Sequence, residues 1–349
     1  MGVIPHSRPL LGDAEAHAVA QVVRGGQLAQ GDRVTAFEEA VARLTGQGQG
    51  VGVNSGTSAL YLALLGLRVG PGDEVVLPSY ACAALWHAVR KTGAEPVLAD
   101  IDPTTYNISP LATARAITSR TKAVIVPHLF GLPMDLADLK VSGIPIIEDC
   151  AQTLGIAVRG RPVGSEGDMT VCSFYATKLL TTGEGGMVLG RTEDLMTRVR
   201  RLRLYDEHDT LEPAFNYKMT EMQAAMGLCQ VNRLDAFLAR RRAIAARYAE
   251  AVTRAALVPP LAPPVMAHAY YRFVVRLPRP VGPVLERAEA LGISCRRPVF
   301  RPLHRYLGLA GFPESDAAWE HALSIPIYPA LTDDEVDRIV AALPVLLAA

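Results

Sequence analysis

One lysine stands in a segment whose composition suits amine chemistry. Lys178 ends the stretch Ser173-Phe174-Tyr175-Ala176-Thr177-Lys178, and a turn rich in Thr and Gly follows it. Only five of the 35 basic residues are lysines. Arginine stays protonated at any working pH, whereas a lysine that loses its proton is an amine nucleophile. Lys178 is therefore a candidate nucleophile, although a solvated surface lysine is the better interpretation of this residue taken alone.

An acidic pair follows an apolar run upstream of this lysine. Pro145-Ile146-Ile147 leads into Glu148 and Asp149, and Gln152 comes three residues later. An apolar run that ends in acids predicts a buried strand with a carboxylate at its C-terminal end, where open α/β sheets bind their ligands. Pyridoxal phosphate (PLP) needs a lysine for its Schiff base and an acidic partner for its pyridinium nitrogen. Taken alone, Asp149 is better interpreted as a helix N-cap.

A turn of small residues near the N-terminus could bind a phosphate. The short strand Val51–Val53 leads into Asn54-Ser55-Gly56-Thr57-Ser58, and an apolar helix is expected from about Ala59 to Leu67. A helix that begins in small residues presents free N–H groups to an anion, and its hydroxyls add donors. The segment matches neither a Walker loop nor a Gly-x-Gly-x-x-Gly fingerprint, which disfavours a nicotinamide enzyme.

These three segments, in this order, resemble the DegT/DnrJ/EryC1/StrS sugar aminotransferases of PLP fold type I. The resemblance spans nearly the whole chain. Further matching segments are Ile4–Pro9, Gly25–Gly31, Pro78–Tyr80, Pro127–Gly131, Asn216–Ala225 and Ile325–Pro329. The resemblance implies an α/β fold in which helices flank a mostly parallel central sheet, followed by a small α+β C-terminal domain.

The resemblance also implies roles for individual residues. Lys178 would carry the Schiff base and move protons, and Asp149 would pair with the pyridinium nitrogen. Gln152 would hydrogen-bond the ring hydroxyl, and Tyr80 would stack on the ring. The phosphate would be held by small polar residues, with one added from the second subunit of a homodimer with composite sites. These residues are Gly56, Thr57, Ser58, Ser173 and the partner's Asn216.

Substrate contacts are the part of the site on which the chain departs from the family pattern. Lys218 replaces the usual Arg, and Phe130 replaces the usual Tyr. His128 is either a substrate contact or a satisfied structural histidine. A basic cluster surrounds Pro298–Phe300 and suits either a diphosphate or a solvated face. The tentative substrate residues are His128, Lys218, Arg296, Arg297 and His304.

Composition narrows the partners and the location. Formal net charge is zero and no basic run is longer than Arg240–Arg242, so nucleic acid is not an expected partner. No apolar stretch reaches the ~18 residues of a membrane helix. The N-terminus lacks a basic-then-apolar signal. Five scattered cysteines without a Cys-x-x-Cys motif predict reduced thiols, a cytoplasmic location and no metal site.

Alternation of apolar strands and helical patterns supports the parallel sheet. Strands are expected at 74–77, 96–99, 123–126, 144–147 and 271–277, and helices near 13–24, 81–92, 192–203, 220–252 and 284–291. A large PLP-binding domain over 1–238, with the N-terminal arm, would precede the rest of the long helix and a small domain over 239–349. The Pro cluster at 259–264 is the linker candidate.

The expected activity is transfer of an amino group from glutamate to a keto-sugar. The resemblance favours a nucleotide-linked 4-keto-6-deoxy sugar as the acceptor. A 3-keto nucleotide sugar or a cyclitol ketone remains possible, because the same machinery serves each of them. PLP-dependent sugar dehydration is disfavoured, because relatives with that activity carry His where this chain has Lys178. A PLP-binding sensor without turnover is the alternative from a different functional class.

Overall fold

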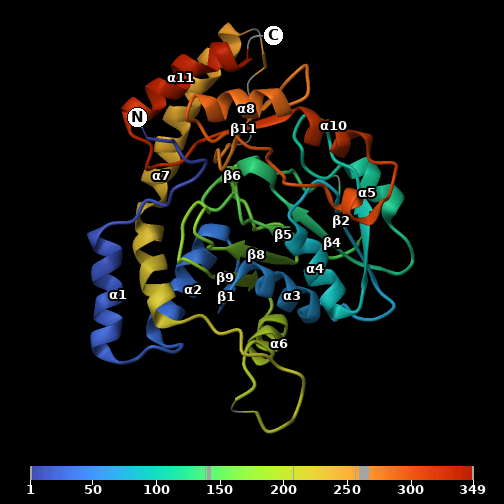
Figure 1. Cartoon of the computed structure of the whole chain (residues 1–349). Helices are drawn as coiled ribbons and strands as arrows, with labels where there is room; N and C mark the ends of the chain where they lie inside the picture. Colours follow the sequence, from blue (N-terminus) through green and yellow to red (C-terminus); the bar gives the residue numbers. More distant parts are fainter. Residues whose placement is uncertain are drawn as a thin grey trace.

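A seven-stranded sheet forms the centre of the protein (Figure 1). The structure is a computed structural model that describes residues 2–137, 139, 143–206, 208–255, 257–258 and 267–347. Five neighbouring strands run parallel, while β9 lies antiparallel between β8 and β1. The expected mostly parallel sheet is confirmed. In spatial order the strands are β1 (Gln49–Val53), β9 (Gly186–Gly190), β8 (Met169–Ser173), β5 (Ile146–Asp149), β4 (Thr121–Pro127), β2 (Glu74–Pro78) and β3 (Glu95–Ala99).

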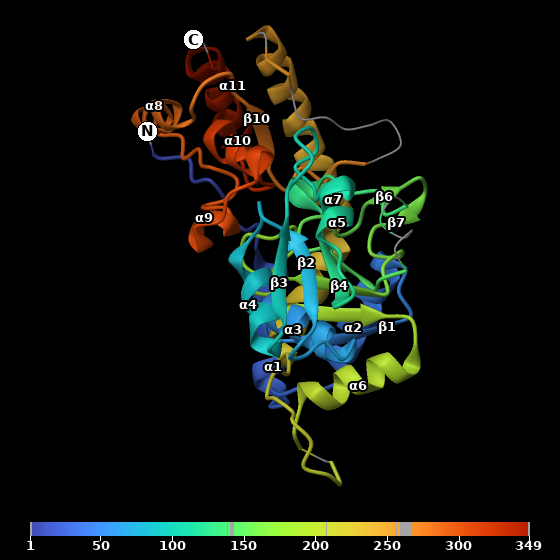
Figure 2. The same cartoon turned by 90° about the vertical axis from the view of Figure 1, so that its right-hand side faces the viewer.

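Helices connect these strands and cover the sheet (Figure 2). Helix α3 is almost entirely apolar and packs against β8 and β9, and Leu62 and Leu64 are fully buried there. Burial of this kind is the dominant favourable term in folding. The helices of this part are α1 (Asp13–Gly25), α2 (Asp32–Thr45), α3 (Gly56–Gly66), α4 (Ala83–Thr92), α5 (Pro110–Ala116) and α6 (Glu193–Arg203). Short elements are the 3-10 turn η1 (Leu129–Gly131) and the hairpin β6 (Ala157–Val158) with β7 (Arg161–Pro162).

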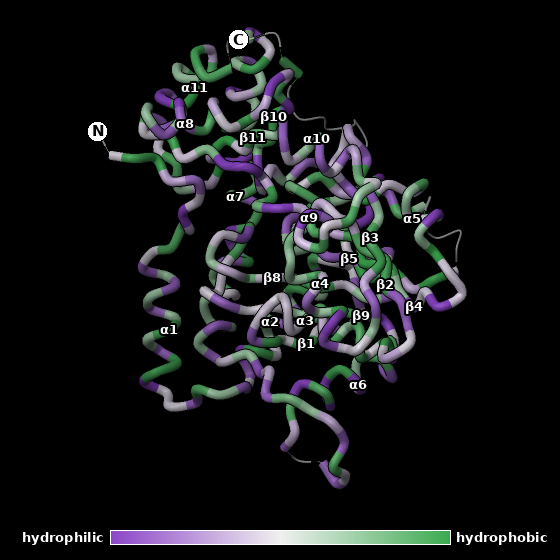
Figure 3. Tube along the Cα trace, turned by 45° about the vertical axis from the view of Figure 1, so that its right-hand side comes forward, coloured by the Kyte–Doolittle hydropathy of each residue, from purple (hydrophilic) through white to green (hydrophobic). Residues whose placement is uncertain are grey.

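The 34-residue helix α7 (Glu221–Arg254) confirms the long helix expected over 220–252. Thr220 caps it by accepting the N–H of Gln223, whose side chain returns to the N–H of Thr220. The carboxylate of Glu221 accepts three backbone N–H groups at the start of α2. Helix α1 packs beside α7, and Figure 3 shows hydrophobic and hydrophilic residues alternating along its turns.

A second hydrophobic core gathers around the C-terminal half of α7. Its strands β10 (Phe273–Arg276) and β11 (Ala322–Ile325) pair antiparallel. Leu238 packs in the core beside the large sheet, whereas Ile244 belongs to the second core. The boundary at 238/239 stays a prediction that this change of core supports. The helices of the region are α8 (Gly282–Ala290), α9 (Leu303–Leu307), α10 (Pro313–His321) and α11 (Asp333–Leu347).

Two details differ from the sequence-based expectations. Strand β5 begins at Ile146, and its pairing with β4 and β8 continues through Asp149, because the neighbouring strands provide ladder partners for the acids. The N-terminal arm, assigned to the large domain, packs at Ile4 into the second core through a bridge to Ile293. The linker expected at 259–264 lies outside the described residues. In the part of the chain that the structure describes, no helix combines the length and apolarity needed to cross a membrane.

Candidate active site

The predicted cofactor residues meet where strands of the large sheet end. Asp149 is the last residue of β5, Ser173 is the last residue of β8, and α3 begins at Gly56. Gly56 and Ser173 approach so closely that a Cβ on Gly56 would lie 2.7 Å from the Cβ of Ser173. Contacts shorter than 3.0 Å between such atoms are not tolerated, so only glycine fits at this position. The start of α3 and the end of β8 thus form one continuous surface.

Asp149 is a buried carboxylate with a nearby cation. Its side chain is 9% exposed, and one oxygen accepts the N–H of Ala151 at 3.0 Å. Burial raises the pKa of Asp149 above its ordinary value, although the positive charge of Lys178 opposes this effect. A buried carboxylate of this kind is stabilised by a further positive group at close range. The protonated nitrogen of a pyridine ring is such a group.

Lys178 lies in the turn after β8, beside an aromatic ring that the sequence did not single out. Its Nζ is 5.3 Å from the ring centroid of Tyr271. The Tyr271 hydroxyl and the hydroxyl of Thr177 are 3.5 Å apart. Burial would raise the pKa of Tyr271, but the positive charges of Lys178 and Arg272 lead the effects that lower it below its usual value. Tyr271 therefore marks a strongly positive environment around the lysine.

The first turn of α3 offers a phosphate fewer free hydrogen-bond donors than the sequence predicted. Ser55 is the N-cap and accepts the N–H of Ser58 at 3.1 Å. The Ser58 hydroxyl donates to Asn54 Oδ1 at 2.7 Å, so hydrogen bonds within the turn already use both donors of Ser58. Thr57 is exposed at the helix start. The N–H groups of Gly56 and Thr57, with the hydroxyls of Thr57 and Ser173, are the donors best placed for an anion.

Hydrogen bonding fixes the orientation of the Gln152 amide. The backbone N–H of Phe130 donates to Gln152 Oε1 at 2.7 Å. Because that oxygen is taken by a backbone donor, the Nε2 group remains as the donor that Gln152 offers. Phe130 adopts a left-handed backbone (φ 60°) at this contact. This geometry fits the expected hydrogen bond to a phenolate-like oxygen of a cofactor.

Taken together, these residues fit PLP. Among the described residues no ion pair neutralises the buried Asp149, and Lys178 lies close enough for its charge to act on this carboxylate. The helix start offers donors to a phosphate. When bound, PLP supplies an electron sink for reactions at the α-carbon of an amino acid. Asp149 would keep the pyridine nitrogen protonated, and the amine of Lys178 would carry protons. These roles stay predictions for the individual residues.

Tyr80 does not have the environment that ring stacking requires. It is fully buried and packs edge-on against Phe130, within a cluster that includes Tyr106. Its hydroxyl donates to the carbonyl oxygen of Ala318 at 3.3 Å. A side chain that stacks on a cofactor needs an open face, and Tyr80 has none. This environment is that of a core aromatic that joins the large sheet to α10, and it argues against the expected stacking role.

His128 is a structural histidine. Its Nδ1 accepts the N–H of Met134 at 3.0 Å, so its Nε2 carries the proton and donates to Glu148 Oε2 at 3.0 Å. The His128 side chain is buried. His128, Glu148 and Cys150 are close enough to share a metal ion, but these hydrogen bonds already use both ring nitrogens. Of the two interpretations of His128, these contacts favour the structural one.

His304 likewise has no ring nitrogen to offer a substrate. Its Nδ1 lies 2.6 Å from Ser79 Oγ, and its Nε2 lies 3.0 Å from Asp316 Oδ1. The residue is 2% exposed, and its ring stacks on Phe312. These bonds argue against the tentative substrate role, which stays a prediction, although His304 is among the residues that line the cavity. His304 instead ties α9 and α10 to the loop that follows β2.

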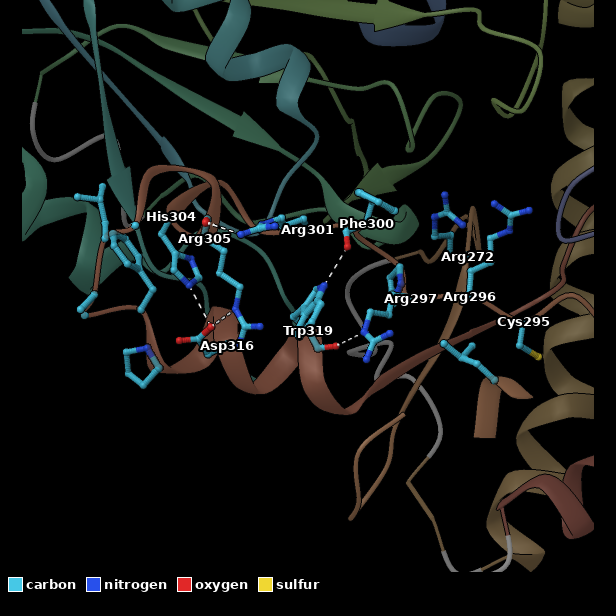
Figure 4. A pocket seen from close by; sticks show the side chains of 18 of the residues that line it. Arg272, Cys295, Arg296, Arg297, Phe300, Arg301, His304, Arg305, Asp316 and Trp319 are labelled. Atoms are coloured by element: carbon cyan, nitrogen blue, oxygen red, sulfur yellow. Dashed lines mark hydrogen bonds and ion pairs between the residues drawn. The ribbon is translucent and has the colours of Figure 1, made fainter. Parts of the chain in front are cut away.

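The other tentative substrate residues lie in two places. Arg296 and Arg297 line a cavity of about 1450 Å³ between the C-terminal helices (Figure 4). Lys218 pairs with Asp206 at 3.4 Å and forms a bridge with Val53, at the strand that leads into α3. Asn216 is exposed beside that bridge. The structure therefore brings Asn216 and Lys218 to the helix-start side of the site, and the two arginines to the cavity.

Several cavity residues had no signal in the sequence. Arg272 follows Tyr271 just before β10 and lines the cavity, and it contacts His6 of the N-terminal arm, which is not itself part of the lining. The indole of Trp319 lies between two guanidinium groups, with Arg297 at 4.4 Å and Arg305 at 4.0 Å from the ring. These contacts join segments far apart in the chain. Arg272 follows two tyrosines, Tyr270 and Tyr271, and this pattern is too common to predict a cavity residue from the sequence.

Comparisons with known proteins show the family of the chain. The family model for the DegT/DnrJ/EryC1/StrS aminotransferase family matches residues 9–344. GDP-perosamine synthase from Caulobacter vibrioides is 34% identical, covering 90% of each chain. The aminotransferase TlmJ from Streptoalloteichus hindustanus is 34% identical, with a TM-score of 0.94 over 99% of this chain and 98% of that one.

A third similar protein has been solved with the cofactor. The PLP form of the putative sugar aminotransferase Spr1654 from Streptococcus pneumoniae is 28% identical, with a TM-score of 0.93 over 99% of this chain and 98% of that one. The expected PLP fold type I is thereby confirmed. The chain belongs to the DegT/DnrJ/EryC1/StrS aminotransferase family and is a PLP-dependent aminotransferase that acts on keto-sugars.

Proposed function

We propose that the acceptor is a 4-keto-6-deoxy sugar linked to a nucleoside diphosphate and that glutamate is the amino donor. The observation that carries the nucleotide link is the arginine-rich cavity shown in Figure 4. Guanidinium groups bind phosphates through two parallel hydrogen bonds and stay charged at any working pH. The five arginines that line the cavity are Arg272, Arg296, Arg297, Arg301 and Arg305.

The cavity also offers apolar surface for a nucleoside. Trp319 lines it, and Phe300 is 85% exposed at its edge. Aromatic rings suit the flat face of a base. GDP-perosamine synthase, 34% identical over 90% of each chain, is named for a GDP-linked sugar. This relative and the cavity together support a nucleotide-linked acceptor, whereas the 4-position follows from family resemblance alone.

Each proposed step of the chemistry uses a residue of the site. Lys178 takes a proton from the α-carbon of the donor and returns one in the second half-reaction. Asp149, buried at the end of β5, keeps the pyridine nitrogen protonated so that the ring accepts electrons. The start of α3 and Ser173 hold the phosphate. Gln152 donates through its free Nε2 group.

The acceptor is tested by a spectroscopic screen. Protein in the pyridoxamine form is mixed with 4-keto nucleotide sugars, 3-keto nucleotide sugars and free cyclitol ketones, and the return of PLP absorption is followed. The proposal expects a fast response to the 4-keto sugars. A response only to 3-keto sugars, or only to a cyclitol ketone, overturns the proposed acceptor. No loss of PLP absorption when the holo-protein meets glutamate would instead favour a sensor without turnover.

We further propose a homodimer with composite active sites. Asn216 is exposed, and the chain around it pairs with the residues that lead into α3, where Asn54 N–H donates to Tyr217 O at 2.9 Å. This position leaves the Asn216 side chain available to a second subunit. Mixed dimers of Lys178→Ala and Asn216→Ala chains place both defects in one site and leave the other intact. Recovery of activity supports the proposal, and no recovery after verified subunit exchange contradicts it.

We place the enzyme in the cytoplasm. All five cysteines are free thiols, which suits a reducing compartment. Burial raises the pKa of Cys150 and Cys172, which keeps both thiols protonated and unreactive. Acid quenching of intact cells, followed by alkylation of the denatured protein, tests this location. The proposal expects five alkylated thiols, and disulfide-linked peptides would contradict it.

A further inference from the structure

Two arginines that line one end of the cavity, Arg272 and Arg296, both act on the imidazole of His6. Arg272 Nη1 lies 3.1 Å from the Nε2 and 3.2 Å from the Nδ1 of His6. The charge of Arg296 acts on the same imidazole. Figure 4 shows the side chains of Arg272 and Arg296 next to each other, at the opposite end of the view from His304. The three residues come from the N-terminal arm, the position just before β10 and the segment beside β11.

The imidazole of His6 is neutral, unlike the two arginines that act on it. Burial, Arg272 and Arg296 lower the pKa of His6 to about 3, so His6 is neutral at working pH. A neutral imidazole accepts a hydrogen bond from Arg272 and thereby orients the guanidinium. His6 Nε2 is 3.0 Å from Ser324 Oγ, which holds the ring in place. His6 therefore positions Arg272 and gives neither arginine a counter-ion.

The arginine pair also has no acidic partner. Within the described residues, no carboxylate forms an ion pair with Arg272 or Arg296. Other arginines near the cores are paired, as Arg203 is with Glu38 at 2.7 Å and Arg305 is with Asp316 at 2.5 Å. Two adjacent guanidinium groups without a counter-ion repel each other and attract an anion. The pair is thus prepared for an anionic ligand.

Arg272, one member of the pair, lies near the amine of Lys178. The Nζ of Lys178 and the Cζ of Arg272 each lie 5.3 Å from the centroid of the Tyr271 ring. The two groups are therefore no further apart than the sum of those distances. The backbone N–H of Arg272 is anchored to Phe130 O at 3.1 Å, next to the residue that orients Gln152. A ligand held by this arginine lies beside the cofactor centre.

We propose that Arg272 and Arg296 bind a carboxylate of the dicarboxylic amino donor. The inference rests on the proposed function and divides the cavity into two ends. The end near Lys178 takes the donor, whereas the end formed by Arg297 and Arg301 takes the diphosphate of the acceptor. The enzyme binds two anionic substrates in turn, and both must reach the same reacting centre. Separate arginines at the two ends would give each substrate its own binding site.

Calorimetry of the apo-protein tests the division without relying on turnover. The probes are glutarate, for the donor carboxylates, and GDP, for the diphosphate. The exposed side chain of Arg296 allows Arg296→Gln without loss of core packing. We expect Arg296→Gln to weaken glutarate binding by about tenfold or more, the magnitude of a lost hydrogen bond to a charged group. Its affinity for GDP should stay within about twofold.

Arg276→Gln is the matched control, because this exposed arginine belongs to β10 but does not line the cavity. It should bind both probes as the wild type does. Unchanged glutarate binding in Arg296→Gln, or a loss of GDP binding as large as its loss of glutarate binding, overturns the division. Undetectable GDP binding by the wild type, with glutarate binding still lost in Arg296→Gln, would reject the nucleotide-linked acceptor and leave the donor site standing.

Discussion

The cofactor centre and the arginine-lined cavity handle charge in opposite ways. At the centre, the buried Asp149 lies near Lys178, so opposite charges are held close together among strand ends. In the cavity, Arg296 and Arg301 are exposed cations without a carboxylate partner among the described residues. The centre is arranged to stabilise charge that appears during a reaction, whereas the cavity is arranged to attract anions from solution.

The difference has a measurable consequence for the two regions. Interactions between buried groups are screened little by salt, whereas those of exposed groups are screened strongly. Substitutions at the cofactor centre should therefore change the rate of the reaction but not the dependence of that rate on salt. Changes in the cavity should affect substrate affinity and its dependence on salt. Four predictions follow this contrast, beginning with the largest expected effect.

Lys178→Ala should abolish turnover. A positioned proton-transfer group contributes roughly 10²–10⁴-fold, and this variant also loses the covalent attachment. The variant should still bind PLP through the start of α3 and Asp149. Steady-state rates and the absorption of bound PLP check both statements. Lys122→Ala, at an exposed lysine, is the control and should keep its rate, and retention of more than a tenth of wild-type turnover by Lys178→Ala would remove this residue from the mechanism.

Asp149→Asn should lower turnover by about 10²-fold, because each pKa unit of lost support for the protonated ring corresponds to about 1.4 kcal/mol. The same substitution should leave the apo-protein at least as stable as the wild type. Burial raises the pKa of Asp149 in the folded state, so ionisation of this group destabilises the apo-fold.

The sign of this effect gives a pH test. The folded state keeps the Asp149 proton longer than the unfolded state, so the wild-type apo-protein loses stability as pH rises from the unfolded pKa of about 3.9 through the raised folded pKa. Asp149→Asn lacks this loss. Thermal unfolding of both apo-proteins between pH 4 and neutrality measures it, and a variant that is less stable across the whole range would contradict the assignment.

His128→Leu should affect stability and spare substrate binding. The substitution leaves the N–H of Met134 without a partner, at about 1–3 kcal/mol for such a group, and it removes the His128 donor from Glu148 Oε2, which keeps the N–H of Gly164. Denaturant unfolding measures the loss. His87→Leu, at an exposed histidine, is the control and should change stability by less than about 0.5 kcal/mol. A raised KM for the keto-sugar at unchanged stability would restore His128 as a substrate contact.

Salt gives the smallest expected effect. Raising the salt concentration from 50 to 500 mM should weaken GDP binding severalfold, because Arg301, which is proposed to bind the diphosphate, is exposed. The same change should not release PLP from the buried centre. Calorimetric titration at the two concentrations measures the first effect, and cofactor absorption after gel filtration measures the second. Equal sensitivity of both ligands would remove the contrast between the two regions.

The sequence predicted the centre better than the cavity, for a physical reason. Asp149, Ser173 and Gly56 lie at the ends of apolar runs, and a parallel sheet brings such ends together. The local sequence pattern therefore predicts where these residues lie. Their individual roles remain predictions, but their placement at strand and helix ends is as expected. The long helix α7 was predictable for the same reason, since its pattern is continuous over many turns.

The cavity depends on contacts between distant segments, which local pattern does not encode. His304 appeared free in the basic cluster, but Ser79, more than 200 positions earlier, takes one of its nitrogens. Tyr80 appeared poised for stacking, but α10 covers it. Arg272 gained its role from His6, 266 positions away. None of these pairings follows from composition or spacing.

The most direct test of the account asks whether the centre and the cavity serve one reaction. Pyridoxamine-form protein is mixed with one 4-keto-6-deoxy sugar in two versions, nucleotide-linked and free, and the return of PLP absorption is timed for the wild type and for Arg301→Gln. We predict that the wild type strongly prefers the nucleotide-linked sugar and that the variant loses much of this preference while its rate with the free sugar is unchanged. Equal wild-type rates with the two versions would contradict the account.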